Sequence, residues 1–533
     1  MLTKVYTAAI QGIDAFPVTI ETLVENGTHF NIVGMADTAV KESQLRIRSA
    51  MQSCGLQFPH YRTTINLAPA DVKKEGASYD LPIAVGLMSA GEMFRCDDLN
   101  EYMITGELSL DGSVLPVRGA LPMAVKAREM GLKKLIVPEA NVTEAAVVNR
   151  LEVYGVRNLS EVVGILAGTG EVRPVSVNTR ELFATDAGRF DFDFSEVKGQ
   201  ESVKRAFEVA CAGAHNILMI GPPGAGKSMM AKRLPSILPP LGMAEALETT
   251  KIHSVAGKLT RGSMLMPRRP FRTPHHTVSP VALVGGGASP MPGEISLAHN
   301  GVLFLDEFPE FPRQVLEVMR QPIEDRVITV SRAKYTVDYP ASCMLVASMN
   351  PCPCGYYGHP TKRCTCAPGQ VSRYMNRISG PLLDRIDLQI EIEPVEFDAM
   401  ADRSPGECSA SIRERVVAAR AVQQARYRNE AGIHSNAQMN SRLLHSYAWP
   451  DETGMKKLKE RMTRLNMSAR AFDRILRVAR TIADLDYATR RSADGSPAHT
   501  PEEAAQLPVL TAHIAEAIGY RSLDRAAYGQ TFQ

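Results

Sequence analysis

The stretch GPPGAGKS decides the fold of this chain; it consists of Gly221, Pro222, Pro223, Gly224, Ala225, Gly226, Lys227 and Ser228. The apolar run 217–220 precedes it as a buried strand would, and residues 229–234 have the composition of a helix. Glycines let successive backbone N–H groups point into one concavity, where the positive end of the next helix attracts phosphate. We therefore expect an α/β nucleotide-binding core in which Lys227 contacts the β- and γ-phosphates and Ser228 ligates Mg²⁺. The competing interpretation is an ordinary glycine-rich turn.

Polar side chains end the next two apolar runs. Asp306 and Glu307 follow residues 301–305, and Asn350 follows residues 344–349. Such runs are typical of central parallel strands whose carboxyl ends face a ligand. We expect Asp306 to hold Mg²⁺ through water, Glu307 to polarise the attacking water and Asn350 to orient it. A solvated strand end is the alternative. The order of loop, paired carboxylates and strand-end Asn resembles that of the AAA+ ATPases.

The composition is that of a soluble globular protein, since 22 % of the residues are charged and 44 % are hydrophobic. A length of 533 residues allows roughly two to four domains. The net charge is only +2, so any contact with nucleic acid requires a local basic patch. No apolar run reaches the length of a membrane span, and the first residues lack the core of a signal peptide. We therefore expect a cytoplasmic protein without membrane contact.

The pattern of strands and helices divides the chain into four segments. Residues 1–170 alternate strand-like runs (63–67 and 134–137) with helical ones (43–52 and 120–130). Residues 171–190 are polar and form the expected linker, and 191–395 form the ATPase core. Residues 396–533 are helical, most strongly over 411–427, 468–486 and 510–518. The expected architecture is an α/β core carrying a helical lid.

The first segment resembles the proteolytic domain of Lon-type proteases, on the evidence of residues 74–82 and 105–117. The resemblance places Ser78 at the position of the nucleophilic serine. Leu121 occupies the position of the lysine that would activate it. A serine hydroxyl without a base is a poor nucleophile, and Lys126 lies more than a helical turn further on. We therefore expect a degenerate Lon-like domain without protease activity.

Several further stretches resemble the magnesium-chelatase-like AAA+ ATPases of the ComM/YifB type. They are residues 269–276, 293–300, 350–355, 379–387 and 520–525. The resemblance covers essentially the whole chain. It implies a homo-hexameric ATP-driven motor that acts on single-stranded or branched DNA as a helicase. In naturally competent bacteria such a motor promotes branch migration while transforming DNA is integrated, with recombination proteins as further partners.

The same resemblance assigns roles to two arginines. Arg385, in the stretch Leu382-Leu383-Asp384-Arg385-Ile386, corresponds to the arginine that reaches the γ-phosphate of the neighbouring subunit. Arg470, in Ser468-Ala469-Arg470, corresponds to a lid residue that senses the γ-phosphate. The alternative for each arginine is a structural ion pair.

Two segments are candidates for contact with DNA. The interval between Ser228 and Asp306 is longer than one helix and one strand need, and its surplus is rich in Gly and Pro. We expect a mobile loop that projects into a central pore and carries the basic candidates Arg268, Arg269, Arg272, His275 and His276. The second candidate is a hairpin over 327–335, with Arg332 and Lys334 near its turn. The alternative for both segments is a contact between subunits.

Four cysteines form two short hooks, Cys352-Pro353-Cys354 and Cys364-Thr365-Cys366. Four thiolates are the ligand set of a structural tetrahedral Zn²⁺ site, and in a reducing compartment metal explains them better than disulfides. Reduced thiols without metal and redox chemistry remain the alternatives.

Three classes of function thus compete. They are a DNA-translocating motor, a chelatase-type ATPase that remodels a protein partner, and an ATP-dependent protease, which Leu121 opposes. The first two share every nucleotide residue, so only the candidate DNA segments separate them.

Overall fold

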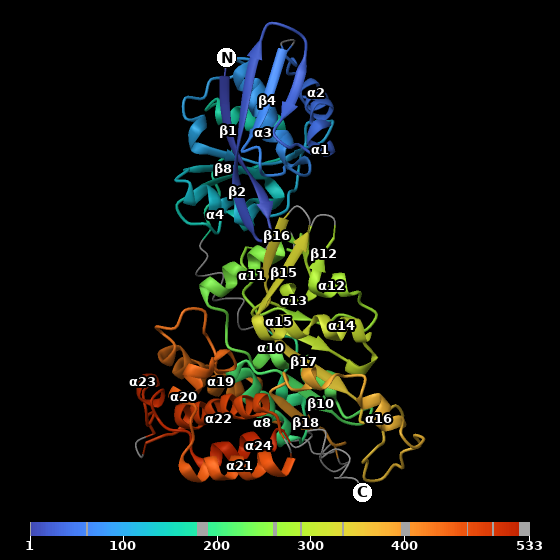
Figure 1. Cartoon of the computed structure of the whole chain (residues 1–533). Helices are drawn as coiled ribbons and strands as arrows, with labels where there is room; N and C mark the ends of the chain where they lie inside the picture. Colours follow the sequence, from blue (N-terminus) through green and yellow to red (C-terminus); the bar gives the residue numbers. More distant parts are fainter. Residues whose placement is uncertain are drawn as a thin grey trace.

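The computed structural model describes residues 2–59, 62–177, 190–259, 264–287, 290–332, 335–395, 406–465, 467–492 and 495–521. Three units follow one another: a mixed α/β unit, a parallel α/β core and a helical unit (Figure 1). Most of the expected linker 171–190, and most of the stretch 520–525, lie outside the described residues. Among the described residues, no helix combines the length and apolar composition needed to cross a membrane.

The first unit is a seven-stranded mixed sheet in the order β3-β4-β2-β1-β5-β8-β9. Burial alternates along β2, as expected for a strand with one face in the core. The strands are β1 (Leu2–Gln11), β2 (Asp14–Glu25), β3 (Phe30–Val33), β4 (Arg62–Ala68), β5 (Tyr102–Ile104), β8 (Lys134–Pro138) and β9 (Glu152–Val156). The principal helices are α2 (Ser43–Ser53), α3 (Asp80–Ala90), α4 (Ala120–Glu129) and α6 (Leu159–Leu166). The two strands and two helices expected here are confirmed as β4, β8, α2 and α4.

The core is a five-stranded sheet in the order β11-β14-β17-β10-β18, with every neighbouring pair parallel. Its strands are β10 (Ile217–Ile220), β11 (Phe271–Arg272), β14 (Val302–Leu305), β17 (Met344–Met349) and β18 (Leu388–Glu391). Every residue of β10, β14 and β17 is buried, which explains their unbroken apolar runs. The phosphate loop, Asp306 and Asn350 all follow the carboxyl ends of these strands.

The helices of the core correct two expectations. Helix α9 (Lys227–Ala231) ends early, and α10 (Leu234–Ile237) begins separately with Pro235 in its first turn, where a missing N–H costs nothing. The surplus before Asp306 contains several short helices and strands, although residues 264–279, which carry the basic candidates, include only the two-residue β11. The surplus contains α11 (Met243–Val255), α12 (Pro280–Val284), the pair β12 (Gly285–Gly286) and β13 (Met291–Pro292), and α13 (Glu294–Leu297). After β14 come α14 (Arg313–Val318), α15 (Arg320–Asp325) and the hairpin of β15 (Val327–Arg332) and β16 (Tyr335–Pro340).

The first unit rests on the core through α11 and the β15–β16 hairpin (Figure 1). The buried Glu144 carboxylate accepts hydrogen bonds from the Leu121 backbone N–H at 3.1 Å and from Ser254 Oγ of α11 at 3.0 Å. Val337 of β16 packs closely against Gly12. A Cβ added to Gly12 would lie 2.7 Å from Val337 Cγ1. Leu121 itself is fully buried and packs in the apolar core. The residue at the position of the Lon-type base is therefore part of the hydrophobic core.

The helical unit packs on the α8 (Glu201–Gly213) side of the core sheet and shares one apolar cluster with it. It contains α19 (Ser409–Arg426), α20 (Ser441–Tyr447), α21 (Glu452–Leu465), α22 (Ala469–Thr489), α23 (Pro501–Ala504) and α24 (Thr511–Gly519). The three expected helices are confirmed as α19, α22 and α24.

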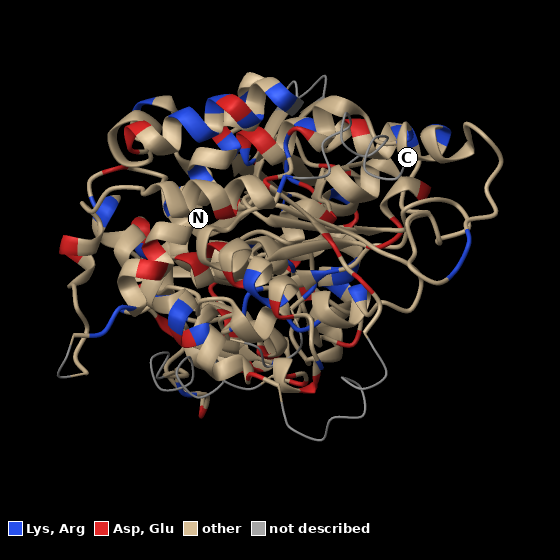
Figure 2. Ribbon diagram, turned by 90° about the horizontal axis from the view of Figure 1, so that it is seen from below, with Lys and Arg blue, Asp and Glu red and all other residues tan. Residues whose placement is uncertain are grey.

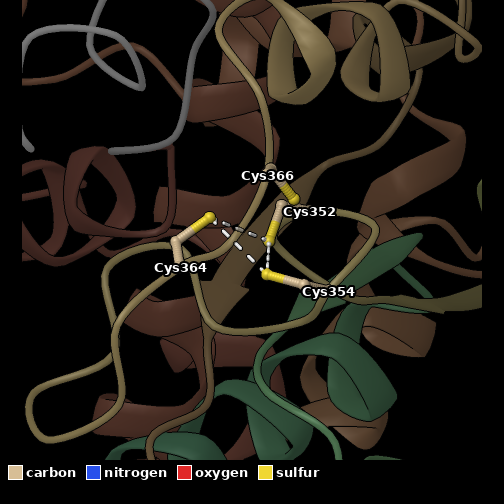
Figure 3. Close-up of side chains that lie close together, drawn as sticks. All are labelled: Cys352, Cys354, Cys364 and Cys366. Atoms are coloured by element: carbon tan, nitrogen blue, oxygen red, sulfur yellow. Dashed lines mark hydrogen bonds between the residues drawn. The ribbon is translucent and has the colours of Figure 1, made fainter.

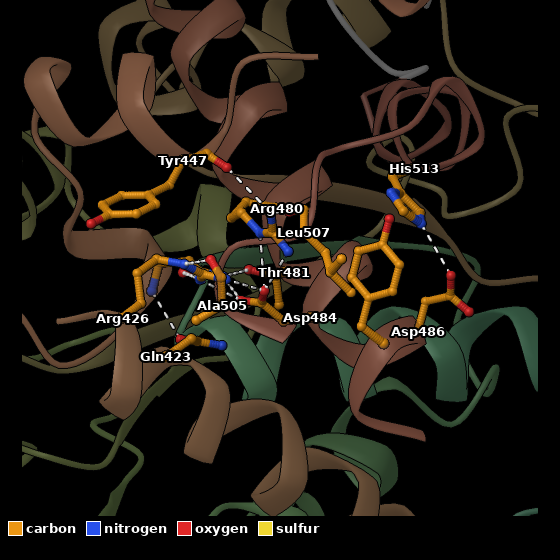
Figure 4. A network of polar contacts seen from close by, with 12 residues as sticks. Gln423, Arg426, Tyr447, Arg480, Thr481, Asp484, Asp486, Ala505, Leu507 and His513 are labelled. Atoms are coloured by element: carbon orange, nitrogen blue, oxygen red, sulfur yellow. Dashed lines mark hydrogen bonds and ion pairs between the residues drawn. The ribbon is translucent and has the colours of Figure 1, made fainter. Parts of the chain in front are cut away.

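A fully buried ion network joins α19 to α22 (Figure 4). The Asp484 carboxylate accepts two hydrogen bonds from Arg426, at 2.6 and 2.8 Å, and one from Arg480 Nε at 2.9 Å. Asn436 donates a further one at 2.8 Å. Burial alone would raise the pKa of Asp484, but the two guanidinium groups outweigh it and hold that pKa below its usual range.

Candidate nucleotide-binding and metal sites

The phosphate loop is formed as the sequence predicts. Gly224 and Gly226 have φ angles of 81° and 84°, in the left-handed region that glycine tolerates. The Lys227 ammonium donates to the carbonyls of Gly221 at 2.6 Å and Pro222 at 2.9 Å, and to Asn350 Oδ1 at 3.0 Å. Burial lowers the pKa of Lys227, while nearby Asp306 opposes that shift. The cation is therefore held inside the loop at the place where a nucleotide's phosphates would meet it.

The two predicted Mg²⁺ ligands lie together. Ser228 Oγ donates to Asp306 Oδ2 at 2.6 Å, and the hydroxyl of Ser348 donates to the other carboxylate oxygen. A hydroxyl and a carboxylate this close fit the oxygen ligands that Mg²⁺ prefers. Ser348, a polar residue within the apolar run of β17, was not among the residues predicted for this site. Ser348 lies beside Asp306 because the residues that precede them, Ala347 and Leu305, pair in adjacent strands.

Glu307 lies at the open edge of this site. Its backbone adopts a left-handed conformation, with φ of 52°, and its side chain is 60 % exposed. His276 Nδ1 lies 3.5 Å from Glu307 Oε2, and the rings of His275 and His276 are 4.0 Å apart. The structure thus places His276, a predicted DNA contact, beside the predicted catalytic carboxylate.

Arg385 and Arg470 lie at the other end of the core sheet. Strands β10 and β18 are parallel, and Ile217 at the amino end of β10 pairs with Leu388 at the amino end of β18. Arg385 comes just before that end of β18. The phosphate loop comes after the opposite, carboxyl end of β10. The Asn216 side chain, next to Ile217, donates to the Arg385 carbonyl at 3.4 Å. Four strand residues separate the two ends by roughly 13 Å. The Arg385 guanidinium binds the Glu324 carboxylate and the Pro381 carbonyl of its own chain.

Arg470 is exposed in the first turn of α22. Ser468, the N-cap of that helix, donates its hydroxyl to Asp384 at 3.4 Å. Because Asp384 precedes Arg385, the lid arginine lies on the Arg385 side of the core rather than on the loop side.

Two predicted DNA-binding arginines have partners within the chain. Arg269 binds the Glu245 carboxylate and the Asn300 carbonyl, and Arg272 binds Glu294 with two hydrogen bonds, at 2.7 and 2.8 Å. Arg268 lies over the ring of Phe190. DNA contact by these residues stays a prediction. For Arg269 and Arg272, such contact would require each arginine to leave its carboxylate partner for a DNA phosphate. Basic and acidic residues are mixed over the view in Figure 2.

The hairpin expected to carry Arg332 and Lys334 is present as β15 and β16. Arg332 is the last residue of β15, and its backbone pairs with Tyr335. Lys334 lies outside the described residues. The contact of Val337 with Gly12 shows that part of this hairpin joins the first unit to the core.

The four hook cysteines form one cluster, with their sulfurs turned toward one another (Figure 3). The Sγ–Sγ distances are 3.3 Å for Cys352–Cys354, 3.8 Å for Cys352–Cys364 and 3.5 Å for Cys354–Cys364. The sulfur of Cys366 completes a group in which all four lie within 4.8 Å. All four thiols are free, and their spacing can hold a metal ion.

Comparisons with known proteins agree with this architecture. Three family models match: Magnesium chelatase, subunit ChlI, over residues 193–400; Subunit ChlI of Mg-chelatase over 20–141; and Magnesium chelatase, subunit ChlI C-terminal, over 406–494. The uncharacterized protein YifB of Salmonella typhimurium is 41 % identical over 527 residues, 98 % of each chain. The chain belongs to the magnesium-chelatase-like ComM/YifB family.

Competence protein ComM of Haemophilus influenzae is 40 % identical over 527 residues, again 98 % of each chain. Lon protease 2 of Bacillus subtilis is 29 % identical over 126 residues, 23 % of this chain and 22 % of that protein. The expected fold class is thereby confirmed for this ComM/YifB family member: a degenerate Lon-like domain, an AAA+ phosphate-loop core and a helical lid.

Proposed function

We propose that this chain is an ATP-hydrolysing, hexameric DNA motor, a helicase that promotes branch migration during recombination or integration of transforming DNA. The observation that carries the ATPase part is the meeting of Lys227, Ser228, Asp306 and Asn350 at one edge of the parallel sheet. The printed name of the Haemophilus relative, competence protein ComM, supports the DNA part.

The proposed chemistry divides the work among separate side chains. Lys227 and the loop N–H groups bind the phosphates, and Ser228 and Asp306 hold Mg²⁺. Bound Mg²⁺ neutralises the charge that develops on the phosphates. Glu307 accepts the proton of the attacking water, and Asn350 orients that water. The exposed position of Glu307 leaves room for water to enter.

The position of Arg385 supports a ring. An arginine at the amino end of β18 lies too far from a γ-phosphate held at the carboxyl end of β10 of its own chain, so a contact with γ-phosphate would require the site of a neighbouring subunit. Arg470 lies on the same side, so we propose that both arginines complete the neighbour's site. Assembly would then exchange the pairing of Arg385 with Glu324 for a pairing with phosphate.

We also propose that the cysteine cluster is a structural Zn²⁺ site. Four sulfurs bound tetrahedrally about 2.3 Å from zinc lie about 3.8 Å apart. The distances of 3.3–3.8 Å among Cys352, Cys354 and Cys364 approach that spacing and are well above the disulfide bond length of about 2.05 Å, and all four sulfurs lie within 4.8 Å of one another. The donor set therefore fits zinc.

The test of the motor is ATP-dependent unwinding of forked or branched DNA, with Glu307→Gln as the control that binds ATP without turnover. Substituting Arg332 and Lys334 by Ala should weaken DNA binding and flatten its salt dependence by about one log–log unit per lost contact. If the wild type hydrolyses ATP but neither binds nor unwinds such DNA, the second candidate replaces the motor. That candidate is a chelatase-type ATPase that remodels a protein partner, and the ion pairs of Arg269 and Arg272 favour it.

A further inference from the structure

We propose that zinc bound by the four cysteines controls the affinity of the adjacent phosphate loop for nucleotide. The inference rests on the zinc and nucleotide sites proposed above and adds a coupling between them.

The first cysteine hook continues directly from the nucleotide site. Asn350, which accepts a hydrogen bond from Lys227 Nζ at 3.0 Å, precedes the buried Cys352 by two residues. The ligand and the residue that fixes the Lys227 ammonium thus share one short stretch of backbone. A displacement of Cys352 would move Asn350 with it.

A second contact joins the hook to the loop. Gly355 has a φ of 85°, and a Cβ at this position would lie 2.5 Å from Pro223 Cδ. The hook backbone therefore packs against the ring of Pro223, in the middle of the phosphate loop. The N–H of Gly355 in turn donates to the Cys352 carbonyl at 3.0 Å, which closes a turn that contains both cysteines of the first hook.

Bound metal would be a strong constraint on this segment. Residues 350–369 contain no helix or strand, so regular secondary structure does not fix the hooks. Zinc binding to four thiolates contributes folding free energy directly, and its loss releases the segment it ties. Without zinc, Asn350 and the hook backbone that packs against Pro223 lose their fixed positions. Nucleotide binding must then also order the phosphate loop, and the free-energy cost of that ordering lowers the affinity.

The first experiment measures metal content and nucleotide affinity in the same preparations of the full chain. We expect about one zinc per chain in protein purified without chelator. Cys364→Ser should lose the metal and weaken binding of a fluorescent ATP analogue about tenfold, equivalent to about 1.4 kcal/mol. Cys408→Ser, at an exposed cysteine outside the cluster, is the matched control and should change neither value. A metal content below half an equivalent would overturn the zinc site and the coupling together.

The second experiment separates the coupling from the metal. Gly355→Ala should keep its zinc but bind the ATP analogue about tenfold more weakly, because its methyl group displaces Pro223. Gly369→Ala is the control: it has a similar φ of 75°, but a Cβ there meets nothing within 4 Å. Unchanged affinity in Gly355→Ala, or an equal loss in both variants, would overturn the coupling while leaving the zinc site and the motor intact.

Discussion

Lys227 and Glu307 should fail in different ways when they are substituted. Lys227→Ala removes the buried ammonium that faces the phosphates, so ATP binding should be lost. Glu307→Gln keeps the loop and the Ser228–Asp306 pair, so ATP should remain bound with turnover reduced by about 10² or more. Equilibrium binding and steady-state phosphate release distinguish the two. Wild-type turnover in Glu307→Gln would contradict its assignment as the base.

His276 should act on catalysis through Glu307. Its Nδ1 lies 3.5 Å from the Glu307 carboxylate, so removing the ring frees that side chain to adopt other rotamers. We expect His276→Ala to lower kcat about tenfold without a comparable change in ATP affinity. Thr277→Ala is the control, because Thr277 follows His276 in the sequence but contacts His275 rather than Glu307. If the two variants lose kcat equally, the contact with Glu307 does not position it.

Single residues were predictable where neighbours in sequence share a task. The phosphate loop and the Asp306–Glu307 pair are continuous segments, so their roles follow from the local pattern. Ser348 reaches the site through the register of neighbouring strands, and His276 reaches it through the fold of the insert before Asp306. Neither the register nor the fold of the insert can be read from a local sequence pattern. The ion pair of Arg272 could not be predicted for a related reason: its partner Glu294 is 22 positions away.

At the scale of elements, the α19–α22 network in Figure 4 makes the lid sensitive to one carboxylate. Asp484→Ala leaves Arg426 and Arg480 buried without a counter-charge, which should destabilise the lid by about 3–5 kcal/mol. Asp486→Ala, on the same helix but 38 % exposed, should cost about 1 kcal/mol or less. Urea unfolding followed by the fluorescence of Trp449, the single tryptophan, measures both. Equal losses would show that burial of the network is not what stabilises the lid.

Elements with a uniform or periodic burial pattern were predictable, because burial sets the pattern of apolar residues. The fully buried strands β10, β14 and β17 are unbroken apolar runs, and the amphipathic α22 shows a helical period. The insert before Asp306 was not predictable, because its elements are stabilised by partners that are distant in the sequence. Helix α11, for example, is covered by the Lon-like domain, through Ser254 and Glu144.

At the scale of the whole molecule, the junction between core and lid should lose stability in acid. Burial lowers the pKa of His215 from 6.5 to about 4, although Asp387 opposes that shift. His215 is also faced by Arg474 and Arg477, and it contacts Thr481 at 2.7 Å. The unfolded chain binds this proton first, so stability falls as the pH drops from about 6.5 towards 4.

Between pH 7 and pH 5 this single group should remove about 2 kcal/mol from the free energy of unfolding. Asp387, whose pKa Arg474 holds below its usual range against the effect of burial, adds to the loss at still lower pH. His215→Gln removes the titration and should flatten the dependence, as measured by urea midpoints at the two pH values. A variant with the slope of the wild type would assign the acid sensitivity to other groups.

The proposed ring predicts complementation between inactive subunits. Arg385→Ala keeps an intact loop, and Lys227→Ala keeps an intact Arg385. Each variant alone should be about 10³-fold or more below the wild type. If Arg385 acts across the interface, random co-assembly of equal amounts should restore about a quarter of the sites, those that combine a good loop with a good neighbouring arginine.

The control for this experiment mixes Lys227→Ala with Glu307→Gln. Both residues come from the same subunit of a site, so no combination regenerates a complete one and activity should stay at the background. Native mass spectrometry of the mixtures establishes that the subunits co-assemble. If activity also recovers in the control mixture, mixing restores the folding or assembly of the variant subunits rather than completing shared sites. Absence of recovery in co-assembled Arg385→Ala and Lys227→Ala rings would confine Arg385 to its pairing with Glu324 and remove the structural argument for a composite site.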